Sequence, residues 1–397
     1  MTHDFDILVS GGGVAGLSAA AAFGAAGFSV LCVDPAPPIT DRDADGADMR
    51  STALLQPARR LLDAAGLWEP IAAHAMPLEV MRIIDAGGAE NVPRRTKDFR
   101  ASDISDLPFG WNVPNWALRR EMVARLDALE GVEFRPGTGT ADVLTRVGEA
   151  RVRLTDGRAV RAAMVIAADG RNSPVRRAAG IGVTTARYGQ KALAFAVTHP
   201  LPHENVSTEI HRTGGPFTLV PLPDYKGQPS SAVVWMDDGP EQVRRAALSP
   251  EAFEAELTQR SCEVLGPLTL ASNRSLWPIV SQRAQQLTAQ RIALMAETAH
   301  VVPPIGAQGL NMSLADLQSL LDLARARPEA LGDAQMLDSY AKARRGDIAV
   351  RVAGIDLLNR ASQAEAAVLR DARGAGLQAL YEMTPVRTGV MRLGLGV

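Results

Sequence analysis

Residues 6–34 constrain this chain more than any other stretch, because they join an apolar strand, a glycine-rich turn, a helix and a second strand. The apolar run at 7–9 predicts a buried strand. It leads directly into Gly11, Gly13 and Gly16, which match the pattern G-x-G-x-x-G. We expect Gly11 to allow the tight turn, Gly13 to let the backbone approach a pyrophosphate, and Gly16 to let the helix pack closely on the strand.

The segment after the glycines completes a nucleotide-binding unit. Val14 and Ala15 begin an alanine-rich helix, whose first backbone amides have no partner within the helix and favour an anion. A second apolar strand ends in Asp34, 23 residues after Gly11 and near the offset at which an acid accepts the ribose hydroxyls. A glycine-rich turn alone is weak evidence. Both strands, the helix and the acid in this order predict a βαβ dinucleotide-binding unit.

The composition excludes several classes of function. The chain has 397 residues, enough for two lobes, and its net charge of −2 gives no reason to expect a nucleic-acid partner. No run approaches the ~18 uncharged apolar residues of a membrane span. Cys32 in the second strand and Cys262 in an expected helix read as small buried hydrophobes, and no cysteine or histidine has metal-ligand spacing. We therefore expect a cytoplasmic protein without a metal site.

Arg50 follows a stretch at 35–48 that is rich in Pro, Asp and Gly and predicts a loop. From Ser51 onward the apolar residues have helical spacing as far as Gly66, which places Arg50 and Ser51 at an expected helix N-terminus. A solvated surface charge is the alternative interpretation of Arg50.

Strands at 141–147, 150–154 and 159–167 are expected next, separated by turn signals. The last strand ends at Asp169, and Ser173 is placed to cap a following helix. This strand-to-helix turn leaves a polar end for a ligand, or it serves only as a structural cap.

The remainder of the chain predicts a second lobe and a return to the first. Residues 78–93 read as two short strands, and alternating segments between 192 and 236 predict an antiparallel sheet. A strand at 291–295 then leads back to the first lobe. It is followed by a turn that contains Pro304 and a helix that begins near Leu310.

Three motifs occur in an order that resembles the flavin-dependent aromatic hydroxylases of the p-hydroxybenzoate hydroxylase fold. They are GGGVAG from Gly11, DGRNSPVR from Asp169 and AETAHVVPPIGAQGLN from Ala296. The resemblance covers nearly the whole chain. Within that class, RSTALLQPARRLLDAAGLW from Arg50 and SYAKARRGDIAVRVAGIDLLNR from Ser339 are similar to the ubiquinone-biosynthesis hydroxylases, which act on polyprenylated phenols.

The resemblance implies an α/β fold with a Rossmann-type FAD-binding domain, an inserted antiparallel-sheet substrate domain and a C-terminal helical region. We expect the FAD-binding domain to comprise residues 1–77, 96–187 and 280–340. The substrate domain would comprise 78–95 and 188–279, and the C-terminal helical region 341–397.

The resemblance also implies a set of cofactor-binding residues. The glycine turn would line the FAD pyrophosphate and Asp34 the adenosine ribose, while Asp169 and Arg176 match a motif that the family associates with both FAD and NADPH. No catalytic residue is identified, and His300 is expected to pack and hydrogen-bond structurally. The expected FAD-binding residues are Gly11, Gly13, Val14, Ala15, Gly16, Asp34, Arg50, Ser51, Asn115, Arg119, Asp169, Glu297, Pro304, Gly309, Leu310 and Asn311.

Two positions depart from the family pattern. The family's Gly-Asp-Ala-Ala-His is Ala-Glu-Thr-Ala-His here, so the acid expected on the ribityl hydroxyls is Glu297, which is one methylene longer. The family's Gly-Gln-Gly begins instead with Ala307. These departures motivate a second hypothesis, a non-catalytic or weakly catalytic subunit of a quinone-biosynthesis complex. A hydroxylase of a different aromatic substrate is a further alternative, and the lack of W-x-W-x-I-P argues against a halogenase.

The activity implied by the resemblance is hydroxylation of a polyprenylated phenol in ubiquinone biosynthesis. It would use FAD, O2 and either NADPH or NADH, and proceed through a flavin C4a-hydroperoxide. An apolar pocket over the ring is one interpretation of five residues in the second lobe, and the core of a sheet is the other. These residues are Phe217, Leu219, Val220, Leu222 and Trp235.

A polyprenylated substrate resides in the bilayer, so we expect a surface for peripheral contact with the inner face of the membrane. Residues 341–397 carry nine basic and five acidic side chains, a net charge of +4. Such helices would present an apolar face flanked by arginines to anionic headgroups or, alternatively, would close the core. The interleaved apolar residues are Leu377, Leu380, Val386, Val390, Met391 and Leu393.

Overall fold

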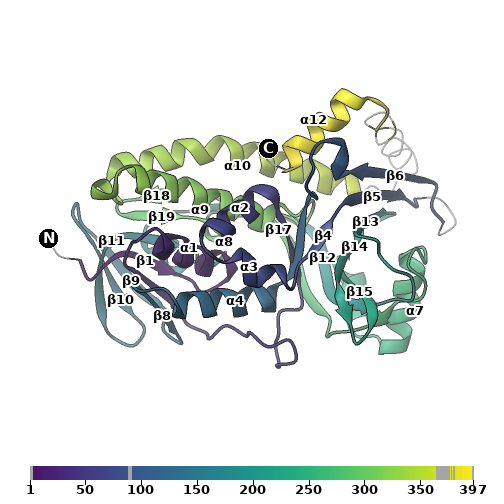
Figure 1. Ribbon diagram of the computed structural model, residues 1–397, viewed down its shortest axis with the longest axis horizontal. Coiled ribbons are helices and arrows are strands. Elements are labelled where there is room, and N and C mark those ends of the chain that lie inside the picture. The colour runs from purple at the N-terminus through teal and green to yellow at the C-terminus, as the bar shows by residue number, and fades with distance from the viewer. Residues whose placement is uncertain (1–2, 88–91, 364–375, 377, 379–380, 396–397) are drawn as a thin grey trace.

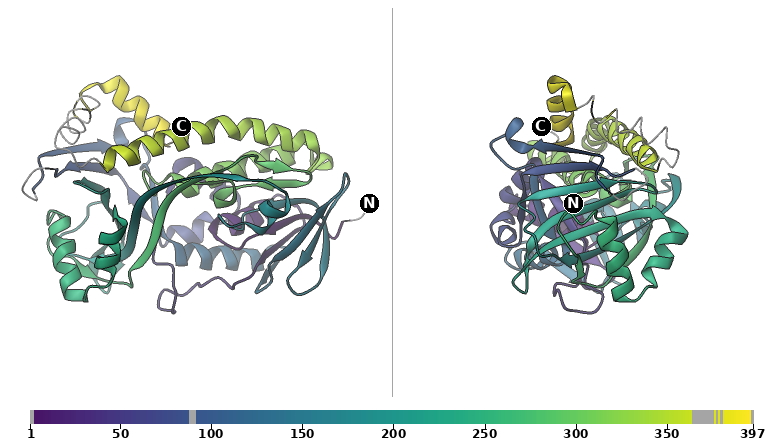
Figure 2. Two further views of the ribbon diagram at one scale, coloured as in Figure 1. Left: turned by 180° about the vertical axis from the view of Figure 1, so that it is seen from behind. Right: turned by 90° about the vertical axis from the view of Figure 1, so that its right-hand side faces the viewer.

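The computed structural model describes residues 3–87, 92–363, 376, 378 and 381–395, which form two lobes (Figure 1). The long strands β12 (Val183–Thr198) and β17 (Ser275–Ala284) run between the lobes (Figure 2). Within the described residues, no helix is both long and apolar enough to cross a membrane.

The first lobe is built on a sheet with β1 (Phe5–Ser10) at its centre. This strand pairs in parallel with β2 (Val30–Asp34) and with β11 (Ala159–Ala167). The predicted βαβ unit is therefore confirmed. The remaining strands are β8 (Val132–Pro136), β9 (Thr140–Thr145), β10 (Ala150–Leu154), β18 (Thr288–Ala289) and β19 (Ile292–Leu294).

Helix α1 (Val14–Ala25) lies buried in the first lobe, between the sheet and the helices α4 (Asn115–Asp127) and α9 (Gln308–Ala326). Its alanine-rich sequence allows this, because small side chains let neighbouring elements approach from several sides. A Cβ at Gly24 would overlap the side chain of Val132 on β8. The short helices α5 (Pro174–Ala178) and α8 (Ala296–Ala299) follow the ends of β11 and β19.

The second lobe is a nine-stranded sheet with the order β20-β17-β12-β15-β14-β13-β5-β6, in which β16 pairs with β12. The predicted antiparallel character is confirmed for most pairs, but β13 and β5 run parallel. Helices α6 (Gly239–Ala246) and α7 (Pro250–Arg260) accompany it. Its strands not yet bounded are β5 (Val80–Asp85), β6 (Arg95–Arg100), β13 (Val206–His211), β14 (Pro216–Tyr225), β15 (Gln228–Asp238), β16 (Thr269–Leu270) and β20 (His300–Val301).

The predicted helix start at Ser51 is wrong. Residues Ser51–Leu55 form strand β3, which pairs with β7 (Gly110–Pro114), and helix α2 (Gln56–Ala64) begins only afterwards. The helical spacing correctly predicts α2, but the first five residues of the predicted helix pair with β7 and form a strand instead. Strand β4 (Met76–Leu78) completes this small sheet, and α3 (Trp68–Ala72) follows α2.

Cys262 also lies outside a helix, because α7 ends at Arg260 and Cys262 has a positive φ of 53° in the following turn. Its expected burial is only partial, whereas Cys32 is fully buried in β2.

Helix α10 (Ala334–Ser362) runs along the top of the molecule from the first lobe to the second sheet (Figure 1). Near its C-terminal end, Asp356 accepts a hydrogen bond from the Tyr188 hydroxyl of β12 at 2.6 Å. Helix α12 (Thr384–Leu395) lies beside it, and short 3₁₀ turns occur at Ala101–Asp103 and Pro328–Ala330. Residue 341, the expected start of the C-terminal helical region, therefore lies inside α10 and not at its beginning.

Candidate functional site

The three glycines of the first turn differ in what surrounds them. A Cβ at Gly11 would overlap the carbonyl oxygen of Ala168, and one at Gly16 would overlap that of Gly11. Gly11 also has a φ of +117°, a conformation that L side chains rarely adopt. A Cβ at Gly13 would meet nothing within 4 Å. Gly11 and Gly16 thus serve the packing of the turn, while Gly13 faces open space that a ligand can fill.

Helix α1 begins at this open position without a side-chain cap. Gly13 is its N-cap residue, and no acidic side chain lies in its first turn. The amides that start at Val14 and Ala15 are therefore available to an anion. Asp34 lies beside the turn, where its carboxylate accepts the Gly12 amide at 2.6 Å and the Ala36 amide at 2.9 Å.

Helix α9 begins in the same uncapped way. Its N-cap residue is Ala307, no side chain caps it, and its first turn contains no acid. Gly309 in that turn is exposed, and a Cβ there would meet nothing within 4 Å. Pro304 is exposed in the loop before the helix, and Leu310 is half-buried. The helices that follow the two glycine-containing turns thus both begin without a side-chain cap, which fits a dianionic dinucleotide with a polar ring system.

Asp169 joins the ends of three elements. Its carboxylate accepts hydrogen bonds from the Thr298 hydroxyl of α8 at 3.0 Å and from the Val175 amide of α5 at 3.2 Å. The Ser10 hydroxyl at the end of β1 lies 3.5 Å away. Two motifs that are 129 residues apart in sequence therefore meet directly, and Asp169 holds them against the glycine turn.

Asp48 gathers three of the predicted cofactor-binding side chains. It accepts two hydrogen bonds from the Arg50 guanidinium, at 2.7 and 2.8 Å, and one from the Arg50 amide at 3.2 Å. Asn115 and Arg119 donate one each, both at 3.1 Å. Burial acts to raise the pKa of the Asp48 carboxyl, but the Arg50 and Asn115 hydrogen bonds and the charge of Arg119 outweigh it and lower the pKa. Asp48 was not among the residues predicted from the sequence. Its only sequence signal was its position two residues before Arg50.

Glu297 lies near Arg50, at the first turn of α8. Hydrogen bonds from Arg50 to Asp48 raise the pKa of Arg50, burial opposes them, and the charges of Asp48 and Glu297 add to the rise. Glu297 itself is exposed. The Arg50 guanidinium also lies over the Trp277 ring of β17, 4.9 Å from the ring centroid. Arg50 therefore faces both lobes, as a residue beside a cofactor at their junction would.

Asn311 and Ser51 contact β3 and its neighbours. The Asn311 side-chain oxygen accepts the Leu55 amide at 2.9 Å, and its amide donates to the Ala53 carbonyl at 2.7 Å. These bonds hold the start of α9 against the small sheet. Ser51 is half-buried opposite Pro114 in that sheet, next to the Asp48 cluster.

Arg176 and His300 have buried structural partners. Arg176 donates to the carbonyls of Thr298 at 2.9 Å and Arg171 at 2.7 Å, and burial lowers its pKa. His300 Nε2 lies 2.6 Å from the Asp316 carboxylate, and both side chains are almost fully buried. The structural role expected for His300 is confirmed. No group of three or more potential metal ligands occurs among the described residues.

The two faces of the second sheet pack against different parts of the molecule. Phe217, Leu219 and Trp235 are buried with Phe253 of α7 in one core, which confirms the core interpretation for these three. Val220 and Leu222 belong to a smaller cluster with Ala196 and Ala232.

The opposite face of the same strands turns toward the first lobe. Ala192 and Met236 belong to the core of that lobe, and the half-buried Val234 and Trp277 pack against it. This face therefore forms the junction between the second sheet and the first lobe.

Comparisons with known proteins agree with this arrangement. A family model described as "FAD binding domain" matches residues 4–353. The ubiquinone hydroxylase UbiL of Rhodospirillum rubrum is 31% identical over 394 residues, which cover 98% of this chain and 89% of that protein. The 3-demethoxyubiquinol 3-hydroxylase of Escherichia coli is 28% identical, covering 99% of this chain and 98% of its own.

Solved structures show the same fold at lower identity. The p-nitrophenol 4-monooxygenase PnpA of Pseudomonas putida superimposes with a TM-score of 0.79 at 18% identity, covering 98% of this chain and 97% of its own. PqsL of P. aeruginosa in complex with 2-aminobenzoylacetate gives a TM-score of 0.76 at 23% identity, covering 91% and 97%.

Proposed function

The chain belongs to the family defined by this FAD binding domain and is an FAD-dependent aromatic monooxygenase, and from this we propose that it hydroxylates a polyprenylated phenol in ubiquinone biosynthesis. The names of the full-length hydroxylase relatives carry the proposal of this substrate class. The apolar side chains of the second sheet that face the first lobe, among them Met236 and Trp277, support an apolar aromatic substrate.

The residues that would hold FAD follow from the geometry of the first lobe. The amides after Gly13 would bind the pyrophosphate, and Asp34 retains lone pairs for ribose hydroxyls. Arg50, Asn115 and Arg119 would lie along the cofactor, oriented by Asp48. Bound FAD supplies electron transfer from the nicotinamide and activation of O2.

The chain's own contribution to the chemistry is binding, orientation and exclusion of water. The uncapped amides at the start of α9 would stabilise a negative charge at Gly309 to Asn311. The buried aromatic core behind the second sheet holds the substrate-facing strands rigid. NADPH or NADH is the proposed reductant, and O2 the co-substrate.

The proposal is tested by product analysis. Purified protein reconstituted with FAD should oxidise NADPH or NADH faster when a polyprenylphenol in detergent is added. Mass spectrometry should show one added oxygen atom from ¹⁸O2 on the ring. NADPH consumption that yields only hydrogen peroxide with every polyprenylphenol, but hydroxylated product with an unprenylated phenol, would reassign the substrate class.

A weakly catalytic subunit of a quinone-biosynthesis complex is the second candidate. The observation that favours it is the pair Ala296 and Ala307, which both have φ of 56° in motifs where the family has glycine. An L residue in this conformation is strained, and the strain would lie beside a bound cofactor. Efficient hydroxylation by the purified protein alone would exclude this candidate.

We also propose peripheral contact with the membrane through α10 and α12. Exposed apolar side chains gather there, and Val350, Leu357 and Leu358 of α10 are 57–69% exposed. On α12, Val390 and Leu393 are 47% and 66% exposed. Lipid contact would remove this apolar area from water.

Two residues expected on the docking surface are buried, so the expectation is wrong for them. Met391 is only 8% exposed and Arg344 only 7%, so both face the protein interior. Leu377, Leu380, Arg370 and Arg373 lie outside the described residues.

A further inference from the structure

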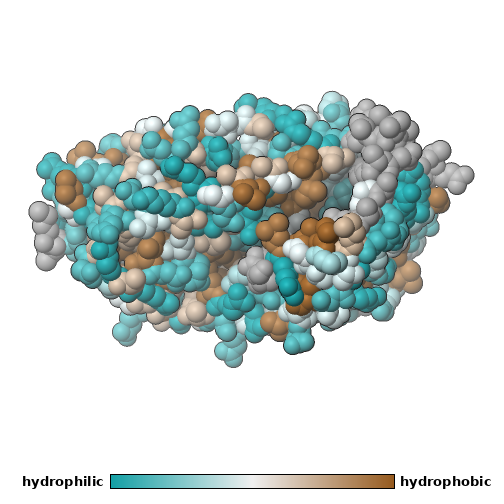
Figure 3. All heavy atoms as spheres, turned by 90° about the horizontal axis from the view of Figure 1, so that it is seen from above, coloured by the Kyte–Doolittle hydropathy of each residue, from teal (hydrophilic) through white to brown (hydrophobic). Residues whose placement is uncertain are grey.

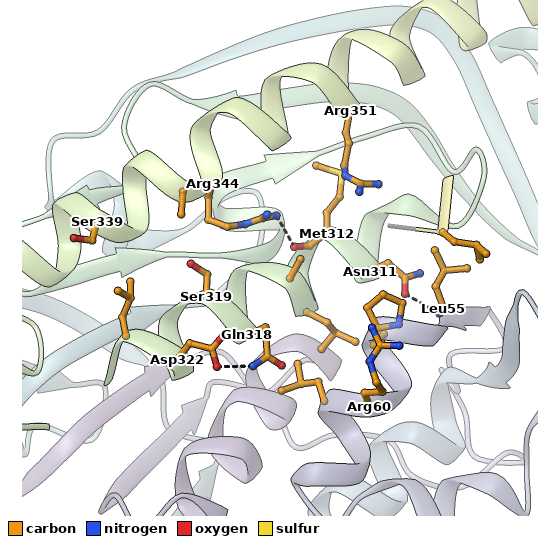
Figure 4. A pocket seen from close by; sticks show the side chains of 18 residues that line it. Leu55, Arg60, Asn311, Met312, Gln318, Ser319, Asp322, Ser339, Arg344 and Arg351 are labelled. Carbon is orange, nitrogen blue, oxygen red and sulfur yellow. Dashed lines mark hydrogen bonds between the residues drawn. The ribbon is translucent and has the colours of Figure 1, made fainter. Parts of the chain in front are cut away.

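A groove of about 660 Å³ lies between helices α2, α9 and α10, and the end of α12 closes one side (Figure 4). It belongs to no part of the site described above except at Asn311, whose side chain is already bonded to β3. Apolar side chains gather near the middle of this upper face of the molecule (Figure 3).

Four apolar side chains line the groove, Leu55 at the end of β3, Leu61 of α2, Met312 of α9 and Leu395 of α12. The polar residues Ser319, Asp322 and Ser339 lie at the end away from Leu55 (Figure 4). Asp322 is already engaged there, since it accepts a hydrogen bond from Gln318 at 2.7 Å.

Two arginines face one another across the groove from opposite walls, Arg60 from α2 and Arg351 from α10 (Figure 4). Arg60 is exposed and has no hydrogen-bond or ion-pair partner within the described ranges. Arg351 contacts Asp347 at 2.8 Å and Gln308 at 2.7 Å. The third arginine of the lining, Arg344, forms salt bridges with Asp316 at 2.7 Å and with Asp347 at 2.8 Å.

The groove is continuous with the exposed apolar face of helix α10. On α10, the groove-lining Ser339 and Ala343 share a face with Val350 and Leu357, because these positions recur at intervals of four and seven residues. An amphiphile resting on that face therefore has direct access to the groove.

We propose that this groove binds one anionic phospholipid, with an acyl chain against Leu55, Leu61, Met312 and Leu395 and the phosphate between Arg60 and Arg351. Charge complementarity selects this occupant, since two guanidinium groups flank an apolar floor and match a phosphodiester with an attached chain. The inference extends the proposed membrane contact, but it concerns a saturable site for a single lipid.

The test uses a lipid that is soluble as a monomer, so binding is separated from vesicle docking and from catalysis. Dihexanoyl phosphatidylglycerol is titrated into the full-length, FAD-reconstituted protein by isothermal calorimetry, below the critical micelle concentration. We expect saturable binding with one lipid per chain. Dihexanoyl phosphatidylcholine and inorganic phosphate should each bind at least tenfold more weakly, because one lacks net charge and the other lacks a chain.

Three variants sharpen the test. Arg60→Gln should weaken binding about fivefold, as expected for one basic residue near an anionic lipid, and it breaks no bond in the described protein. Ala343→Trp should abolish binding by filling the groove from the exposed side of α10. Arg153→Gln is the matched control, since Arg153 is 65% exposed on β10 in the first lobe and should leave lipid affinity unchanged.

Several results would overturn the proposal. They are equal affinity for phosphatidylcholine, equal affinity for free phosphate, and unchanged lipid binding in both Arg60→Gln and Ala343→Trp. Sedimentation that shows a dimer disrupted by Ala343→Trp would instead assign the groove to a second copy of the chain. If the wild-type protein binds the lipid but hydroxylates no polyprenylphenol, the proposed function is refuted and the proposed lipid site is not.

Discussion

At the scale of single residues, the glycine turn separates a binding role from a folding role. Gly13→Val should abolish FAD binding and leave the protein folded, because its φ of −73° suits valine and its Cβ would project into open space. Gly16→Val should prevent folding of the first lobe, because its Cβ would overlap the Gly11 carbonyl. FAD fluorescence quenching and far-UV circular dichroism measure the two effects. A folded Gly13→Val protein with unchanged FAD affinity would remove the pyrophosphate from this turn.

The positive φ of Ala307 predicts a measurable cost in the free energy of unfolding. Its φ of 56° costs an alanine about 1 to 2 kcal/mol relative to glycine, which exceeds the entropy that glycine loses on folding. Ala307→Gly should therefore stabilise the protein by up to ~1 kcal/mol in urea unfolding. Ala343→Gly, on the exposed side of α10, is the control and should destabilise it by about the same amount.

Glu297 tests the expected contact with the ribityl chain. Glu297→Ala should weaken FAD binding by ~1 to 3 kcal/mol if its carboxylate bonds the cofactor, and Glu297→Asp should retain most of the affinity. Glu297 is exposed, so neither change should alter the free energy of unfolding of the apoprotein by more than ~0.5 kcal/mol. Unchanged FAD affinity in Glu297→Ala would end this assignment.

At the scale of elements, Asp48 connects the loop before β3 to helix α4 through Asn115 and Arg119. Its pKa is lower in the folded protein than in the unfolded chain, so its contribution to stability is present above its unfolded pKa. That contribution is lost as the pH falls through the lowered folded value. Wild-type stability should therefore decline below about pH 4 more steeply than that of Asp48→Asn. Parallel urea-unfolding curves for the two proteins between pH 5 and pH 3 would contradict this coupling.

Strand β20 and helices α9 and α10 are joined by a buried charged cluster. Asp316 of α9 contacts His300 at 2.6 Å and Arg344 of α10 at 2.7 Å. Such a cluster adds little net stability, but removing one member leaves an uncompensated buried charge. The geometry fixes how α10 sits on α9, and so it shapes the groove between α2 and α10.

At the scale of the whole molecule, the proposed membrane contact predicts how the protein partitions. Binding to liposomes should rise with anionic lipid, fall with salt, and drop when residues after Pro385 are removed. The double change Val390→Ser and Leu393→Ser should weaken it without disturbing the buried Met391 and Leu395.

Leu144→Ser with Val147→Ser is the matched control, since both residues are exposed apolar side chains in the first lobe. Equal sedimentation of the truncated and full-length proteins with anionic liposomes would show that α12 is not the anchor.

Features that depend on near neighbours could be predicted from the sequence. The glycine turn, the helix after it and the strand that ends in Asp34 are confirmed, because turn sterics and helix periodicity are local. The strands at 140–167 and the uncapped start of α9 near Leu310 were predictable for the same reason.

Only the tertiary structure decided the contacts between distant segments. Ser51 lies in a strand because β7, about 60 residues later, pairs with it and overrides the helical pattern. Asp48 accepts hydrogen bonds from Arg50, Asn115 and Arg119 because α4 packs beside its loop. Strand alternation predicts that Phe217 and Trp235 lie on one face of the sheet. It does not predict that α7 covers this face while the other face packs against the first lobe. Such choices depend on which surfaces exclude water together, and no local pattern records that.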